Sequence, residues 1–177
     1  AFFGFMFGPA VGFMAGAAGN VVGDLFVGTV SPHWSVANGL IGLIAGMARM
    51  MDDEQQSFNV GAAIAGIGGV VAAAFYFAGP DTQLSFLMGL SVLVGAGLAI
   101  ALRFAFPNRR EWALAAVWGS AGVIVGPGLA SIAGIWVNGS TLSEAVLGEF
   151  IPAAGPSLIA LAILLPTWLK TLVARPE

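Results

Sequence analysis

The stretch FGFMFGPAVGFMAGAAGNVVGDL, residues 3–25, decides the fold class of this chain. The 23 residues before Asp24 carry no charge. About 20 consecutive apolar residues cross the hydrocarbon core of a bilayer as a helix. Because the pair Gly8-Pro9 is a turn signal, the stretch predicts the end of one helix at residues 1–7 and a membrane span from residue 10 onward.

The rest of the chain repeats this pattern. Five further stretches between charged residues contain 24, 26, 21, 32 and 20 uncharged residues. Of the 177 residues, 58% are hydrophobic and 8% are charged, whereas a soluble domain is about 25% charged. The sequence therefore predicts an all-α, polytopic transmembrane helical bundle in a single domain, residues 1–177, with about six spans and a partial N-terminal helix. The expected spans are residues 10–29, 35–51, 58–78, 84–104, 111–137 and 143–173.

Several classes of chemistry are excluded by composition. The chain has no cysteine and one histidine, which rules out disulfides, thiolate metal sites, iron–sulfur clusters and covalently attached haem. No catalytic triad, H-E-x-x-H, P-loop or dinucleotide motif is present. We therefore expect no catalytic residue, metal site or cofactor, no enzymatic activity and no nucleic-acid partner, only membrane lipids around the bundle.

The basic residues predict the orientation in the membrane. If the spans alternate, every Lys and Arg falls on the side of the Gly8-Pro9 turn and the C-terminus. An excess of Lys and Arg marks cytoplasmic loops. The C-terminus is therefore expected to be cytoplasmic, in the inner or plasma membrane of the cell. The residues concerned are Arg49, Arg103, Arg109, Arg110, Lys170 and Arg175.

Small residues form a stripe on the first full span. At 100° per residue, Gly12, Gly16, Gly19 and Gly23 cluster on one face, where helix backbones can approach closely. Tight packing within one bundle is the favoured interpretation. The alternative is that this face docks a partner membrane subunit, and both interpretations can hold together.

Polar side chains are concentrated in the expected outer half. Asn20 and Asp24 lie one turn apart and share a face, and Asn38 lies opposite if the two spans pair. A charged residue within a membrane span usually faces the bundle interior or a cavity and marks function. Taken singly, each polar residue is more simply a loop, cap or interface residue. Their concentration makes the following residues candidate substrate contacts: Asn20, Asp24, Trp34, Asn38, Trp136, Asn138, Glu149 and Ser157.

Two expectations concern individual groups. If Asp24 is charged it needs hydrogen-bond donors, and we expect these from Asn38 and from the backbone N–H groups at the start of the next span, near Ser35. His33 follows Pro32 in an expected outer loop and is predicted to be solvated. A metal or pigment ligand is the alternative for His33.

Residues 3–25 resemble the signature of the S components of energy-coupling factor transporters, which is commonly written f-G-P-x-x-G-x-x-x-G-x-x-G-[ND]-x-x-x-D-L. Residues 34–47, WSVANGLIGLIAGM, are similar to the next helix of that family. FIPAA at residues 150–154 and the pair Leu165-Pro166 resemble its last helix. Since the family has six helices, the resemblance implies that the first and most of the second precede Ala1 and that residues 58–104 form an inserted hairpin.

The resemblance implies a function and a set of partners. The protein would capture a vitamin-like small molecule in an outward-facing pocket and dock on a transmembrane coupling subunit carrying two ATPases. The pocket would draw on the outer ends of the helices containing Asn38, Trp136 and Glu149. Many members of the family carry an Asn in the last helix, where this chain has Gly155-Pro156-Ser157.

A second hypothesis belongs to another class of protein. The featureless stretch 58–104 and the many small-residue faces also fit a non-catalytic structural or accessory subunit of a larger membrane complex. A cavity of about 300 Å³ or more in the outer half, the size of a small-molecule site, would favour the substrate-binding hypothesis.

Overall fold

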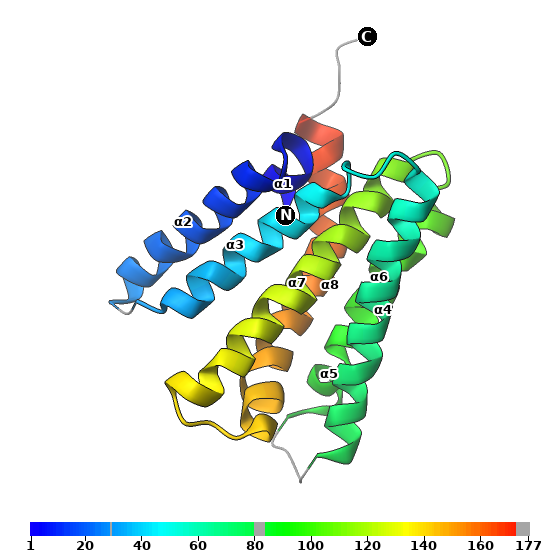
Figure 1. Cartoon of the computed structure of the whole chain (residues 1–177). Helices are drawn as coiled ribbons and strands as arrows, with labels where there is room; N and C mark the ends of the chain where they lie inside the picture. Colours follow the sequence, from blue (N-terminus) through cyan, green and yellow to red (C-terminus); the bar gives the residue numbers. More distant parts are fainter. Residues whose placement is uncertain (29, 80–83, 173–177) are drawn as a thin grey trace.

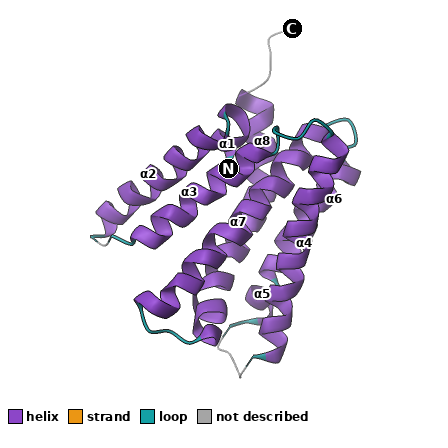
Figure 2. Cartoon of the chain, in the orientation of Figure 1, coloured by secondary structure: helices purple, strands orange, loops and turns teal. Residues whose placement is uncertain are grey.

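The computed structural model describes residues 1–28, 30–79 and 84–172, and these form helices without a strand (Figures 1 and 2). The prediction of an all-α, polytopic bundle is confirmed. Four helical segments, α2, α4, α7 and the continuous η1–α8, are long and apolar enough to cross a membrane. The elements are α1 (Phe2–Phe7), α2 (Pro9–Val27), α3 (Pro32–Met47), α4 (Glu54–Ala78), α5 (Phe86–Gly89), α6 (Ser91–Ala105), α7 (Arg110–Val137), the π-helix η1 (Glu144–Phe150) and α8 (Ile151–Leu172).

Helix α7 is the centre of the bundle. It packs against α3, α4, α6 and α8, while the α2–α3 hairpin lies at one edge and α4 and α6 at the other (Figure 1). Residues 113–123 of α7 are buried without a break. They are mostly Ala, Gly and Val, and a helix that is apolar on every side is one that neighbours surround on every side. The small side chains let those neighbours approach closely.

Glycines bring α2 and α3 into backbone contact. A Cβ on Gly12 would collide with the carbonyl oxygen of Gly42, and one on Gly16 would collide with the carbonyl oxygen of Asn38. Nothing lies within 4 Å of the corresponding positions on Gly19 and Gly23. The inner half of the glycine stripe therefore packs within this chain, while docking of a partner on the outer half stays a prediction.

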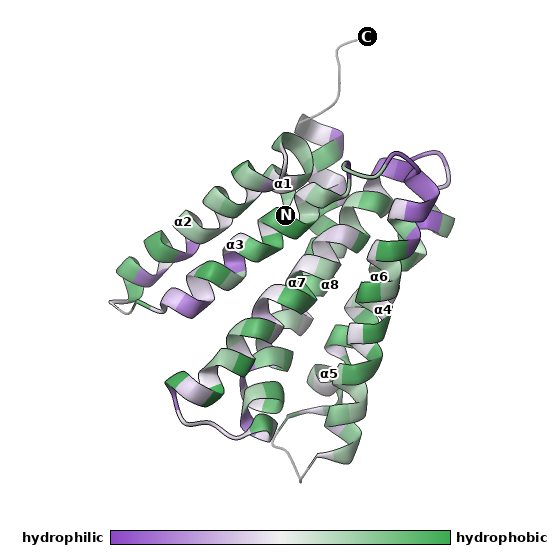
Figure 3. Cartoon of the chain, viewed as in Figure 1, coloured by the Kyte–Doolittle hydropathy of each residue, from purple (hydrophilic) through white to green (hydrophobic). Residues whose placement is uncertain are grey.

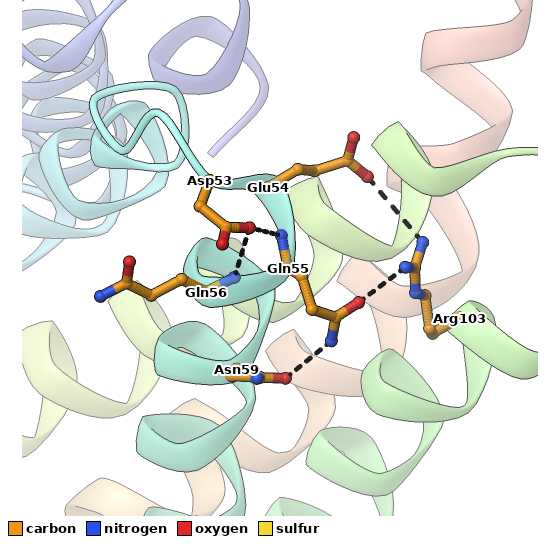
Figure 4. A network of polar contacts seen from close by, with 6 residues as sticks. All are labelled: Asp53, Glu54, Gln55, Gln56, Asn59 and Arg103. Atoms are coloured by element: carbon orange, nitrogen blue, oxygen red, sulfur yellow. Dashed lines mark hydrogen bonds and ion pairs between the residues drawn. The ribbon is translucent and has the colours of Figure 1, made fainter.

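Charged and amide side chains gather at one end of the bundle, where α3 joins α4 and α6 joins α7 (Figure 3). Asp53 caps α4 by accepting hydrogen bonds from the backbone N–H groups of Gln55 and Gln56 at 2.8 and 3.1 Å (Figure 4). Arg103 of α6 donates to Oε1 of Gln55 at 2.9 Å and lies 3.8 Å from a carboxylate oxygen of Glu54. These contacts tie the ends of α4 and α6 together.

The helix directions place Arg49, Arg103, Arg109, Arg110 and Lys170 at this same end. The sixth basic residue, Arg175, lies outside the described residues. A cytoplasmic location for this end stays a prediction.

Several helices differ from the expected spans, and three of the differences concern the start or continuity of a helix. Helix α3 begins at Pro32 rather than at residue 35, because proline suits the first helical position, where its missing N–H is not needed. The span expected at 84–104 is broken at Leu90 into α5 and α6. The last span opens as a π-helix at Glu144, just before Pro152, which has no N–H to donate to the preceding turn. The expected end residues 29 and 173 lie outside the described part.

The glycine contact between α2 and α3 can be tested with a matched pair. Gly12→Ala is expected to lower the free energy of unfolding by about 1–3 kcal/mol, the usual cost of overpacking a tight interface. Gly19→Ala, on the same helix, meets no atom within 4 Å and is expected to leave stability unchanged or raise it by up to about 1 kcal/mol through helix propensity. Unfolding of the purified protein in mixed micelles by a denaturing detergent provides the measurement. Equal effects of the two substitutions would contradict the assigned contact.

Candidate functional site

A polar network joins the end of α2 to the start of α3. Asp24, near the end of α2, accepts a hydrogen bond at Oδ2 from the backbone N–H of Ser31 at 2.8 Å and another from the side-chain amide of Asn20 at 3.2 Å. Asn20 lies one turn earlier on α2, so the two side chains share a face. Because Ser31 is the N-cap of α3, the carboxylate sits at the positive end of that helix, where a negative charge is stabilised.

The network continues along α3. The amide of Asn38 donates to Oδ1 of Asn20 at 2.8 Å and to the carbonyl oxygen of Trp34 at 3.0 Å. The Asn20 amide also donates to the hydroxyl of Ser35 at 3.1 Å. Asp24 therefore faces protein, as expected, but the expected donors were wrong. Its partners are Ser31 and Asn20, because α3 starts one turn earlier than the sequence predicted, and Asn38 reaches Asp24 only through Asn20.

This network is closed within the chain. Asn20, Asp24 and Asn38 are half-buried, Ser35 is buried, and their polar groups hydrogen-bond one another or the α3 backbone. Polar groups in a membrane must be satisfied internally. The arrangement can fasten the outer end of α2 to the start of α3, and it leaves these amides committed to each other.

A cavity of about 340 Å³ lies on the other side of α3, between α3 and α7. On α3, the cavity residues 33, 36, 37 and 40 follow the i, i+3, i+4, i+7 spacing of one helical face. The network residues Ser35 and Asn38 lie on the opposite face. The lining residues are His33, Val36, Ala37, Leu40, Gly126, Leu129, Ala130 and Ala133.

His33 contributes a polar side chain to this apolar lining. It lies in the first turn of α3, partly buried, and its Nε2 is hidden from solvent without a hydrogen-bond partner among the described residues. The prediction of a solvated loop histidine is therefore wrong. Pro32 is the feature of the sequence that could have revealed this site. Because it starts the helix, His33 lies on the same helical face as Val36 and Leu40.

The remaining predicted contacts lie elsewhere. Glu149 of η1 packs over α7, where a Cβ on Gly134 would lie 3.0 Å from its Oε2, an oxygen that is buried without a hydrogen-bond partner among the described residues. Asn138 borders the same glycine. Trp136 is 78% exposed, and the exposed Ser157 donates to the carbonyl oxygen of Ala153 in its own helix.

The structure thus separates the predicted contacts into groups. Asn20, Asp24 and Asn38 form one network, with the backbone of Trp34 as an acceptor, while Glu149 and Asn138 flank Gly134. Trp136 and Ser157 join neither group, and a role in substrate binding stays a prediction for all of them. Within the described ranges, no three His, Asp or Glu side chains are arranged to hold a metal ion.

Comparison with known proteins bears on the part of the chain that carries the polar network. Residues 1–80 match the family model of the ECF-type riboflavin transporter S component. Over these residues the chain is similar to the S components of energy-coupling factor transporters. The resemblance seen in residues 3–25 is thereby confirmed. The match extends through α4, beyond the residues that carried the resemblance, and does not include residues 111–173.

A curated relative gives a second likeness. A UPF0397 protein of Aster yellows witches'-broom phytoplasma (strain AYWB) is 40% identical over 61 residues, which cover 33% of this chain and 33% of the relative. The chain thus matches about a third of that relative's length. No solved structure matches this chain. The family match includes α2, α3 and the whole polar network, whereas the α7 wall of the cavity lies outside it.

The role of Asp24 is tested by removing its carboxylate. Asp24→Ala is expected to lower the free energy of unfolding by about 1–3 kcal/mol, since the Ser31 N–H and the Asn20 amide lose their acceptor. Asp52→Ala, in an exposed turn, is the matched control and should change it by no more than about 0.5 kcal/mol. Unfolding of each variant by a denaturing detergent in mixed micelles measures the change in its free energy of unfolding. A negligible effect at Asp24 would show that the network does not hold α2 to α3. Asp81 would be a second acidic control by its sequence, but it lies outside the described residues.

Proposed function

We propose that this protein is the substrate-capture subunit of a micronutrient importer and that it binds a small molecule in the cavity between α3 and α7. The observation that carries the proposal is the cavity itself. Its volume of about 340 Å³ falls within the range of about 300–1,000 Å³ typical of small-molecule sites. Its lining residues lie in the half of the bundle opposite the basic residues, which agrees with a pocket facing outward.

Riboflavin is the first ligand to test. The family model that matches residues 1–80 is named for a riboflavin transporter, and the apolar lining suits a flat aromatic ring. The residues of α3 that form one cavity wall lie within the matched region. The α7 wall decides which ring fits, and it supplies mainly Ala and Gly.

The same proposal implies partner subunits for this protein. A substrate-capture subunit of this family would dock on a transmembrane coupling subunit served by two ATPases, because the chain itself has no nucleotide-binding motif. Helix α2 offers the free surface for docking. Met14, Leu25 and Phe26 are 68%, 65% and 89% exposed on it, and Gly19 and Gly23 leave open space beside them.

An accessory subunit of a larger membrane complex is the second candidate. The exposed apolar length of α2, and a polar network whose hydrogen bonds join residues of this chain to one another, favour this role. The two candidates differ in what the cavity contains, since an accessory subunit has no need of a specific ligand. Ligand binding by the purified protein separates them.

Binding is measured by quenching of riboflavin fluorescence in detergent solution. The wild-type protein is expected to bind, and Ala133→Leu, which fills part of the cavity, is expected to weaken binding at least about tenfold, equivalent to ~1.4 kcal/mol. Ala101→Leu adds the same side chain at an exposed position on α6 and should bind as the wild type does. Failure of a vitamin panel to bind or to raise the melting temperature would favour the accessory role.

Orientation is tested by labelling single cysteines, since the chain has none of its own. Asn108→Cys lies in the connection before α7 and Leu142→Cys in the connection after it. A membrane-impermeant maleimide is expected to label position 142 in intact cells and position 108 only after the membrane is opened, because the basic end is cytoplasmic. The reverse pattern would place the cavity on the inner side and contradict capture from outside.

A further inference from the structure

The chain contains two Asn-Gly pairs, and the structure places them in opposite surroundings. Asn38-Gly39 lies within α3, whereas Asn138-Gly139 follows the last residue of α7. In an Asn-Gly pair the backbone nitrogen of the glycine can attack the side-chain amide carbon of the asparagine, because glycine has no Cβ to hinder the approach. Since the two pairs share this chemistry, their surroundings decide which of them reacts.

The pair Asn38-Gly39 is held in an unreactive conformation. The Asn38 amide donates to Oδ1 of Asn20 at 2.8 Å and to the carbonyl oxygen of Trp34 at 3.0 Å. Gly39 is buried, and a Cβ on it would lie 2.7 Å from the ring of Phe13. To bring the Gly39 nitrogen onto its amide carbon, Asn38 would have to rotate its backbone out of the helix and break these contacts.

The pair Asn138-Gly139 has none of these constraints. Asn138 is the C-cap of α7, and its backbone N–H donates to the carbonyl oxygen of Gly134 at 2.7 Å. Both residues of the pair are exposed, and the backbone N–H of Gly139 has no backbone acceptor among the described residues. Gly139 has a φ of 71°, in the left-handed region that favours glycine. Because the helix has already ended, Asn138 can rotate its backbone without unwinding α7.

We propose that Asn138 is a site of spontaneous deamidation. The backbone nitrogen of Gly139 attacks Cγ of Asn138, and the new C–N bond closes a succinimide ring. The bond from Cγ to Nδ2 breaks, and the leaving amide group takes up the proton of the Gly139 nitrogen and departs as ammonia. Water then adds to either carbonyl of the ring and opens it to aspartate or isoaspartate. Solvent water is the co-reactant, and both residues are exposed at the end of α7 (Figure 1).

The product places a new negative charge beside Glu149. The Asn138 amide nitrogen and both carboxylate oxygens of Glu149 lie within 3.5 Å of one point, the position that a Cβ on Gly134 would take. A carboxylate at position 138 would face that of Glu149 at close range, and like charges repel more strongly near protein than in bulk water. It would also lie at the negative end of the α7 dipole. Deamidation is therefore expected to weaken the contact between α7 and η1.

The test follows both Asn-Gly pairs in the same wild-type protein. The purified protein is incubated in detergent at mildly alkaline pH in ¹⁸O water, and peptide mass spectrometry measures the aspartate and isoaspartate formed at positions 38 and 138. Conversion at position 138 is expected to be at least about tenfold faster, equivalent to ~1.4 kcal/mol of activation free energy. In protein unfolded by a denaturing detergent with urea, the two rates are expected to converge, because the structural difference is then lost.

Three variants test the reaction and its product. Asn138→Gln cannot close the same ring and is expected to abolish conversion at this position. Asn138→Asp carries the charge of the product and is expected to melt at a lower temperature than the wild type and than Asn138→Gln. Asn108→Asp adds the same charge in the exposed connection before α7. It is the control and should not lower the melting temperature, because Arg109 and Arg110 follow it.

The outcomes separate the reaction from its effect, and both from the proposed function. Absence of conversion at position 138, equal rates at the two positions in the folded protein, or a rate difference that persists after unfolding overturns the assignment. Conversion at 138 with an Asn138→Asp variant as stable as the wild type overturns the expected effect on α7 and η1. Faster conversion together with a lower melting temperature supports both. No ligand enters these measurements, so they stand apart from substrate binding in the cavity.

Discussion

Close approach of helix backbones at glycine is the constraint on which the rest of the structure depends. Between membrane helices the hydrophobic effect supplies no driving force, so close packing and interhelical hydrogen bonds must hold them together. Gly12 of α2 meets α3 at Gly42, and Gly126 of α7 meets α3 at Ala37. Helix α3 is thereby fixed on two sides at once, with no side chain between the backbones. The cavity between α3 and α7 lies beside the contact of Gly126 with Ala37.

The two faces of α3 therefore differ in what they contact. One face carries the hydrogen bonds that join Asn20 and Asp24 to the start of α3. The other face turns His33 toward an apolar space in which its Nε2 has no described partner. In a membrane protein, polar residues within the spans pair with one another or with backbone carbonyls. The glycine contacts make this division possible because they set α3 at a fixed distance from α7.

Much of the fold could be predicted from the sequence. Uncharged runs of about 20 residues located the spans within a few residues, and the motif in residues 3–25 identified the family. The break at Leu90 and the π-helical turn at Glu144 were not predictable from hydropathy, since neither changes the apolar character of its segment. The candidate site was predicted only in part. The shared face of Asn20 and Asp24 followed from helical spacing, but Asn38 was expected to donate to Asp24 rather than to Asn20. The start of α3 at Pro32 was also missed, and with it the donors of Asp24 and the burial of His33.

The sequence alone determined that the chain is a bundle of membrane helices, which end carries the basic residues and which face of α2 carries the glycines. These properties depend on composition and on the 100° step of a helix, so a single chain reveals them. Only the tertiary structure decided which glycines face a neighbour, that Trp136 points outward and that His33 borders a cavity with α7. These outcomes depend on how closely α3 and α7 approach each other, although 62 residues, from Ala48 to Arg109, separate them along the chain. That distance is set by contacts between helices, and no local pattern in either helix records it.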